Sequence, residues 1–246
     1  MSYIAKKGRA AAESAMQEGG KDYSKALVKF KSGTTYIVRV PSLSDFVEYF
    51  NHSVFKVFYS TPCTRANGKE DLFDKAVALL YDDAKKAKDA GKEKEAEELR
   101  NQAYQLKAKP KYLFGFFDLE TGEPIIIDLS KKQAQVVITA VDKFAKRVGS
   151  LAFEISKTGT GTSTAVSFIP LLDDMTATQQ KNFDATAGKE FPEELYGKVL
   201  YVKNEEEQAK DLIAFGFDVG RLGITLTDEE VTPIDDNTDD DPAANF

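Results

Sequence analysis

The sequence has little of the residues on which catalysis and cross-linking most often depend. It holds one cysteine, one histidine and no tryptophan among 246 residues. The lone cysteine, Cys63, excludes an internal disulfide and is typical of a reducing cytoplasm. The lone histidine, His52, leaves little room for histidine-based catalysis or a histidine-rich metal site. No apolar run approaches the roughly 20 residues of a membrane-spanning helix, and no signal peptide is present, so we expect a cytoplasmic protein with no membrane partner.

Motifs of the familiar enzyme classes are missing as well. The chain contains no G-x-x-x-x-G-K-[ST], no G-x-G-x-x-G after a strand, no G-x-S-x-G and no H-E-x-x-H. The acidic residues Asp118, Glu120, Glu123 and Asp128 flank one predicted turn, where solvation explains them better than a nuclease metal. We therefore expect a protein that is not an enzyme and has no cofactor.

Charge is distributed unevenly along the chain, whose net charge is −7. Residues 1–160 carry 27 Lys and Arg against 21 Asp and Glu, residues 161–221 carry 6 against 11, and residues 222–246 carry none against 8. A basic body with an acidic end indicates a polyanion-binding protein. Solubility alone would also produce an acidic tail.

Hydrophobic periodicity divides the chain into strands and helices. Strands are predicted within 26–42, where two strands flank the turn Ser32-Gly33, and within 49–60, 111–119, 124–129, 151–157 and 164–170. A charged helical hairpin is predicted at 70–107, and a helix capped by Ser130 follows the stretch 124–129. Beyond Pro170 the pattern is mostly helical up to about Ile224.

These elements predict a mainly β fold with added helices, an OB-fold-like barrel of five or six strands with one helix between strand pairs. A β-sandwich remains the alternative. We divide the chain into a basic amino-terminal arm (1–20), the barrel core (21–171, with the insertion 70–107), a mixed helical region (172–226) and a disordered acidic tail (227–246).

Aromatic and basic residues interleave on the predicted strands. Single-stranded nucleic acid requires this mixture, because exposed bases stack on aromatic rings while phosphates need cations. Many of the phenylalanines are expected in the core, so tyrosine, lysine and arginine are the stronger candidates. The predicted nucleic-acid-binding residues are Lys29, Lys31, Arg39, Tyr49, His52, Phe55, Lys56, Tyr59, Arg65, Lys109, Lys111 and Tyr112.

Three segments, taken in order, resemble the phage single-stranded-DNA-binding (helix-destabilising) proteins of replication. They are KKGRAAAESAMQEGG, FKSGTTYIVRVPS with its Arg39 and Pro41, and the terminal DDDPAANF. The resemblance implies an OB-fold core that binds single-stranded DNA without sequence preference. It also implies an arm that mediates self-association along DNA and a tail that recruits replication or recombination proteins in a bacterial host. The partner-binding residues so implied are Lys6, Lys7, Arg9, Asp239, Asp240, Asp241 and Phe246.

The acidic tail is also expected to compete with DNA for the basic groove. Three rival functions stay open. They are an RNA-binding OB protein, a scaffold or adaptor that works through the tail, and, in third place, a metal nuclease.

Some proteins of this family hold zinc with a histidine, a cysteine about a dozen residues later and a C-x-x-C beyond. His52 and Cys63 match the first two positions, but the chain has no further cysteine. A four-ligand site is then not available from cysteine and histidine, so the sequence predicts a zinc-free protein.

Overall fold

The computed structural model describes residues 23–224. The predicted arm (1–20) and tail (227–246), with Lys6, Lys7, Arg9, Asp239, Asp240, Asp241 and Phe246, lie outside the described residues.

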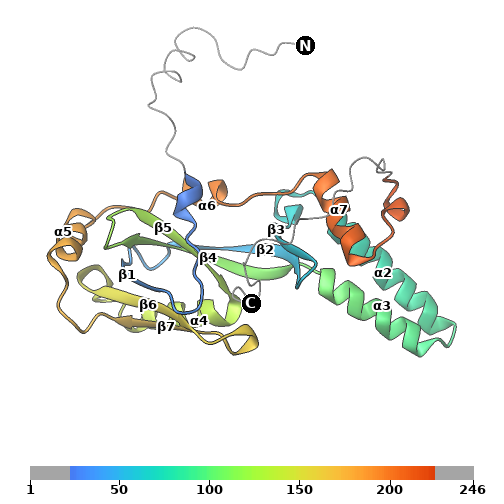
Figure 1. The fold of residues 1–246 in the computed structure, drawn as a ribbon, viewed down its shortest axis with the longest axis horizontal. Coiled ribbons are helices and arrows are strands. Elements are labelled where there is room, and N and C mark those ends of the chain that lie inside the picture. The colour runs from blue at the N-terminus through green and yellow to red at the C-terminus, as the bar shows by residue number, and fades with distance from the viewer. Residues whose placement is uncertain (1–22, 225–246) are drawn as a thin grey trace, which may run out of the picture.

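Seven strands in this part of the chain form one curled antiparallel sheet, a half-barrel (Figure 1). The strand order is β3-β2-β4-β1-β6-β7, and β5 pairs with the other edge of β4. The strands are β1 (Thr35–Arg39), β2 (Phe46–Val54), β3 (Phe58–Pro62), β4 (Lys109–Asp118), β5 (Pro124–Ser130), β6 (Ala152–Thr158) and β7 (Ala165–Pro170).

The long strand β4 organises the sheet. Its first half pairs with β2, from Asn51 opposite Lys109 to Phe46 opposite Phe114. Its last residues pair with β1, with Val38 opposite Asp118. β1 and β2 therefore follow the same edge of β4 as one bent strand that is interrupted at 40–45, which lets the sheet curl.

Helix α4 (Lys131–Lys143) fills the open side of the half-barrel. In the described chain β5 and β7 are not paired with each other, and α4 packs against β4, β5 and β7. The helix begins with a capping box, in which Ser130 and Gln133 satisfy each other's backbone N–H groups. Val137 and Val141 of α4 join a core that includes Phe153 and Phe168 of the sheet.

The insertion between β3 and β4 is a helical hairpin made of α2 (Leu72–Asp89) and α3 (Glu93–Leu106). The two helices turn at Gly91, whose φ of 77° lies in the left-handed region that glycine adopts without strain. Figure 1 shows the hairpin projecting from one end of the sheet. The predicted insertion at 70–107 is confirmed.

The carboxy-terminal region wraps back over the rest of the molecule and adds no separate core. It contains α5 (Ala177–Ala185), α6 (Glu194–Lys198) and α7 (Glu205–Phe215). Leu212 and Phe217 join the core of the helical hairpin. Phe191 and Leu195 cover the face of β4 opposite to α4. Short 3₁₀ helices lie at Tyr23–Ala26, Thr64–Asn67, Val148–Ser150, Gly161–Ser163 and Val219–Leu222.

Most predicted strands are present, with one exception. The fold class also differs from the predicted one. The first half of the predicted hairpin within 26–42 is not a strand: Leu27 makes only an isolated bridge to Ile126, although Phe30 is buried. The helices together hold more residues than the strands, so the fold is mixed α and β and not mainly β.

Gly115 on β4 permits the close approach of the segment that contains α6. A Cβ atom at this position would lie 2.5 Å from Tyr196 Oη and 2.7 Å from the Phe191 ring. We expect Gly115→Ala to lower the free energy of unfolding by about 1–3 kcal/mol, because both rings must shift in a packed core. Urea denaturation measures this. In Gly197→Ala, the matched control, the added Cβ meets nothing within 4 Å, and an equal loss in both variants would contradict the packing argument.

Candidate nucleic-acid interface

One face of β2 and β4 carries a row of aromatic side chains. The rings of Phe46 and Phe114 are stacked with their centroids 5.1 Å apart, and those of Phe114 and Phe116 are 6.2 Å apart. This inner end of the row packs in the core beneath α4. Strand alternation places residues 46, 48 and 50 of β2 on this same face.

The outer end of the row is open to solvent. Phe50 is 46% exposed and lies opposite Pro110, while Glu48 lies opposite Tyr112. Phe50 and Tyr112 are therefore diagonal neighbours on one face, a separation that aromatic side chains span. Tyr112 is half-buried, and its hydroxyl donates to Glu48 Oε1 at 2.9 Å. This pair offers ring surface at the edge of the core.

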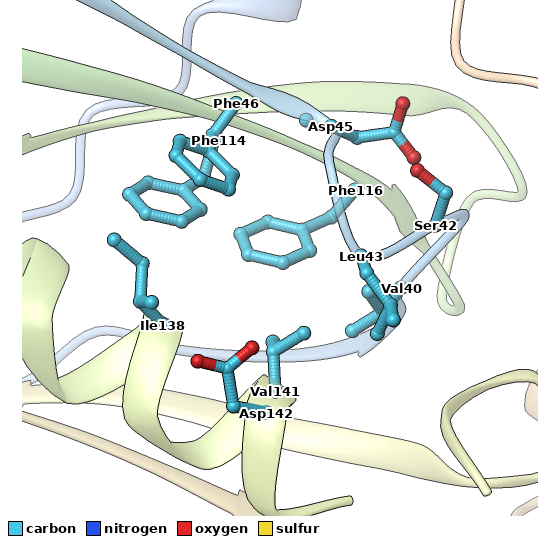
Figure 2. Close-up of a pocket in the computed structure, with 11 residues that line it drawn as sticks. Val40, Ser42, Leu43, Asp45, Phe46, Phe114, Phe116, Ile138, Val141 and Asp142 are labelled. Atoms are coloured by element: carbon cyan, nitrogen blue, oxygen red, sulfur yellow. The ribbon is translucent and has the colours of Figure 1, made fainter. Parts of the chain in front are cut away.

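A cavity of about 270 Å³ lies at the inner end of the row, between the sheet and α4 (Figure 2). Phe46, Phe114 and Phe116 line one side, and Ile138 from α4 lines another (Figure 2). Asp45 and Asp142 also line it. Because two carboxylates repel phosphate, this cavity does not suit a nucleic-acid backbone.

Positive charge gathers at the outer end instead, where α4 begins. Ser130 lies opposite Lys111 in the sheet, so the next residues, Lys131 and Lys132, start the helix beside β4, and both are exposed. The first turn of α4 has no acidic residue. Two cations at the positive end of a helix dipole are unfavourable for the helix itself, and a bound anion would remove the conflict.

Further cations lie where the chain passes from α3 into β4. Lys107 and Lys109 are exposed, and Lys109 Nζ lies 5.5 Å from the centre of the exposed Tyr104 ring. We use the term basic aromatic surface for the residues at this end of the sheet, around the first turn of α4, the end of α3 and the start of β4. They are Phe50, Tyr104, Lys107, Lys109, Tyr112, Lys131 and Lys132. The surface covers both faces of the sheet, because Lys109 lies opposite Asn51 and so points away from the face of Tyr112.

The tip of the β2–β3 hairpin carries a second aromatic and basic group. Phe55 is 49% exposed and Tyr59 is 56% exposed. Lys56 Nζ lies 5.5 Å from the centre of the Phe55 ring. Lys56 has a φ of 59°, in the left-handed region that costs a non-glycine residue roughly 1–2 kcal/mol. Glycine would adopt this backbone conformation without strain.

We expect Lys56→Gly to weaken DNA binding without lowering the stability of the fold. The variant should be as stable as the parent or up to about 1 kcal/mol more stable, because the strained φ is relieved. Its affinity for single-stranded DNA should fall, and the slope of log affinity against log salt should decrease by about 0.7. Thermal melting and fluorescence anisotropy measure the two effects. Unchanged affinity for single-stranded DNA would show that the hairpin tip does not contact the DNA.

The structure does not fit the prediction that Arg39 contacts phosphate. Arg39 is buried, and its guanidinium donates to the carbonyl oxygens of Phe183 at 2.8 Å and of Gly149 at 2.7 Å. The guanidinium carbon also lies 4.3 Å from the centre of the Phe183 ring. The side chain holds β1 to α5 and is not available to a ligand.

Lys111 and Tyr49 are likewise engaged with a protein partner. Lys111 Nζ pairs with Asp128 Oδ2 at 2.6 Å, and its side chain is 14% exposed. The Tyr49 hydroxyl donates to the same oxygen at 3.0 Å. Burial, with the adjacent Asp128 carboxylate, raises the pKa of Tyr49. The predicted phosphate contact of Lys111 and base contact of Tyr49 therefore do not fit their positions.

His52 belongs to a buried cluster with Cys63, Asp71 and Asp74. His52 is fully buried and cannot contact DNA, so that prediction is wrong. The Arg65 guanidinium is bound to the Asp74 carboxylate. The Arg65 side chain is itself 61% exposed and binds this cluster from its edge, so its predicted contact with DNA stays a prediction. The prediction of a zinc-free protein counted only cysteine and histidine as ligands, whereas here two carboxylates join His52 and Cys63.

The remaining predicted residues are accessible. Lys29 and Lys31 are exposed in the segment before β1. Lys109 and Tyr112 belong to the basic aromatic surface, and Phe55, Lys56 and Tyr59 belong to the hairpin tip. Sequence reasoning missed Phe50, Tyr104, Lys107, Lys131 and Lys132 as site residues. The basic pair directly after the capping residue Ser130 was the available signal for Lys131 and Lys132, because acidic residues are favoured in that turn.

A scan against models of protein families finds no match, and a search of curated proteins finds no similar chain. None of the helices described between residues 23 and 224 has the length and apolar content to cross a bilayer.

Proposed function

We propose that this protein binds single-stranded DNA without sequence preference. The observation that carries the proposal is that the exposed Phe50 and the half-buried Tyr112 lie at the same end of the sheet as the start of α4. Lys131 and Lys132 form the first turn of that helix, directly after Ser130, which pairs with Lys111. Unstacked bases need ring surface and phosphates need cations, and this end of the sheet carries both. Duplex DNA hides its base faces and would not use the rings.

We further propose that the half-barrel is an open OB fold. The order of its elements supports this: a long bent strand (β1 and β2), the hairpin β4–β5, the helix α4 and the hairpin β6–β7. In this interpretation α2 and α3 are an insertion between the first and second barrel strands. The cytoplasm of a bacterial host, replication or recombination of phage DNA, and a non-enzymatic role complete the proposal, and they rest on the resemblance of the sequence.

RNA binding is the second candidate. The same rings and lysines serve either nucleic acid, and the distinction depends on contacts to the 2′-hydroxyl. A scaffold that works only through its acidic tail would instead leave the basic aromatic surface without a ligand.

Fluorescence anisotropy with labelled oligo-dT, oligo-rU and a duplex, with and without magnesium, separates these functions. We expect tight binding to oligo-dT, weaker binding to the duplex, and no cleavage of any strand. Preference for oligo-rU would favour the RNA function. Absence of binding to all three would leave the scaffold function.

The tail prediction follows from its charge. Deleting residues 228–246 removes eight acidic groups and should raise the affinity for single-stranded DNA most at low salt. The reason is that the Debye length falls from about 30 Å at 0.01 M to about 10 Å at 0.1 M, which screens a tethered acidic competitor. Paired titrations at the two salt concentrations measure this. A truncated protein that binds no tighter at 0.01 M would rule out competition by the tail.

A further inference from the structure

A second group of reactive side chains lies buried between the β2–β3 hairpin and α2. His52 on β2, Cys63 directly after β3, and Asp71 and Asp74 at the start of α2 each place a potential ligand atom within 4.8 Å of the others. All four residues are buried. Three separate segments of the chain thus converge on one point.

The imidazole of His52 is oriented for a ligand. Its Nδ1 lies 2.8 Å from the carbonyl oxygen of Leu106, and a carbonyl only accepts, so Nδ1 carries the proton. Its Nε2 lies 3.3 Å from Asp71 Oδ2 and 3.9 Å from Asp74 Oδ1, yet it makes no hydrogen bond within the described chain. A carbonyl that fixes Nδ1–H and leaves Nε2 with a lone pair is the usual support of a metal-binding histidine.

We propose that His52 Nε2, Cys63 Sγ and one carboxylate oxygen each from Asp71 and Asp74 bind a single divalent cation of the zinc type. Zinc takes nitrogen, sulfur and oxygen ligands at about 2.0–2.3 Å in a tetrahedron, whose edges are then about 3.3–3.8 Å. Cys63 Sγ lies 3.3 Å from Asp74 Oδ2. Because all four ligand atoms already lie within 4.8 Å of one another, no separation needs to contract by more than about 1.5 Å to reach that geometry.

Local charge favours a cation here. Without a metal, the two carboxylates bring two negative charges to this buried site. When a divalent cation binds and Cys63 loses its proton, the site carries three negative charges, of which the cation cancels two. The Arg65 guanidinium, whose Nε donates to Asp74 Oδ2 at 3.1 Å, offsets the third. In the competing arrangement no metal is bound, and His52 Nε2 carries a second proton. The resulting imidazolium would face the Asp71 carboxylate. That arrangement predicts no metal uptake.

Four protein ligands in a buried position make a closed site, which is typical of structural zinc. The cation would join β2, the end of β3 and the first turn of α2, and so fix the helical hairpin to the sheet. This inference does not depend on the binding of DNA.

Metal binding should release a proton from Cys63. Burial, together with the adjacent Asp71 and Asp74 carboxylates, raises the pKa of the Cys63 thiol to about 12. The metal-free thiol is therefore protonated at neutral pH, whereas a metal ligand must be a thiolate.

The test uses the full chain, stripped of metal with a chelator and titrated with Co²⁺ and then Zn²⁺. We expect one Co²⁺ per chain, with the ultraviolet charge-transfer absorption of a thiolate ligand, which only Cys63 can supply because the chain has one cysteine. Zinc should displace the cobalt. At a free zinc concentration of about 100 times Kd, the Tm should rise by about 5–10 °C.

The variants separate ligation from folding. Cys63→Ser should abolish the charge-transfer absorption. Asp71→Asn keeps a good helix cap, because Asp71 Oδ1 accepts from the N–H of Asp74 and asparagine caps as well as aspartate. It should nevertheless weaken zinc binding by at least about 100-fold, since loss of an outer-shell partner alone costs about 10–100-fold. Asp82→Asn, an exposed acid on the same helix, is the control and should bind as the parent does.

Three results would overturn the proposal. They are the absence of stoichiometric metal uptake with an unchanged Tm, cobalt binding without thiolate absorption, and parent-like zinc affinity in Asp71→Asn. The first of these would assign a second proton to His52 in place of the metal.

Discussion

Replacing four lysines of the basic aromatic surface by glutamine should lower the affinity for single-stranded DNA by about 10²–10³-fold at 0.1 M salt. The four are Lys107, Lys109, Lys131 and Lys132, all of which are exposed. If each lysine neutralises one phosphate, the slope of log affinity against log salt decreases by about 0.7 per lysine, or by about 3 in total. The fold should be unaffected or slightly stabilised, because Lys131 and Lys132 oppose the dipole of α4.

The control for this variant changes the net charge by the same amount at a distant place. Four exposed lysines near the turn of the α2–α3 hairpin serve this purpose: Lys85, Lys86, Lys88 and Lys94. Their replacement by glutamine should leave the salt slope within about 0.5 of the parent, as long-range charge is screened beyond about 10 Å at 0.1 M salt. Equal losses in the two variants would mean that DNA responds to net charge and not to this surface.

Phe50→Ala should weaken single-stranded DNA binding by about 1–3 kcal/mol, or about 5- to 150-fold, with an unchanged salt slope. The physical reason is that the ring supplies stacking surface and no charge. Stability should change little, because almost half of the side chain is already exposed. Anisotropy titrations at several salt concentrations measure affinity and slope together.

Tyr81→Ala removes an aromatic ring of similar exposure from α2 and is the matched control. It should bind DNA as the parent does. If Phe50→Ala binds equally well, the assignment of Phe50 as a stacking residue is wrong, and the hairpin tip with Phe55 and Tyr59 becomes the next aromatic site to test.

The alternation of side chains along β2 explains why the sequence pointed to Tyr49 and not to Phe50 as the base-contacting residue. Tyr49 and Phe50 are adjacent on β2 and so point to opposite faces. A preference for tyrosine over phenylalanine favoured Tyr49, but its hydroxyl is bound to Asp128, while Phe50 is the exposed member of the pair. The register with β4 fixes this choice, and sequence periodicity alone does not contain it.

Contacts between distant segments explain the basic residues that sequence reasoning misplaced. Arg39 lies on a strand, as predicted from the alternation of apolar and polar residues. Its guanidinium is bound by the carbonyl oxygen of Phe183, which lies 144 residues later in the sequence. Lys111 is paired with Asp128 because β4 and β5 are neighbours. Local periodicity predicted the strands, whereas the partners of buried charges depend on how helices return over the sheet.

The buried cluster was hidden by a second role of its residues. Asp71 and Asp74 stand at the N-cap and in the first turn of α2, where acidic residues need no further explanation. Only the convergence of β2 and the end of β3 on this turn brings His52 and Cys63 to them. Turns and helices of strong local character, such as the α2–α3 hairpin, were by contrast predicted from the sequence.

Phe50→Trp offers the most direct measurement of the central claim that bases stack at the outer end of the aromatic row. The chain has no tryptophan, so the variant contains a single indole at the proposed site, and stacking of a base on it quenches its fluorescence. Titration with oligo-dT should quench the emission in proportion to the DNA bound by anisotropy, while a Tyr81→Trp variant should keep its emission. Binding of oligo-dT with undiminished Phe50→Trp emission would contradict the account.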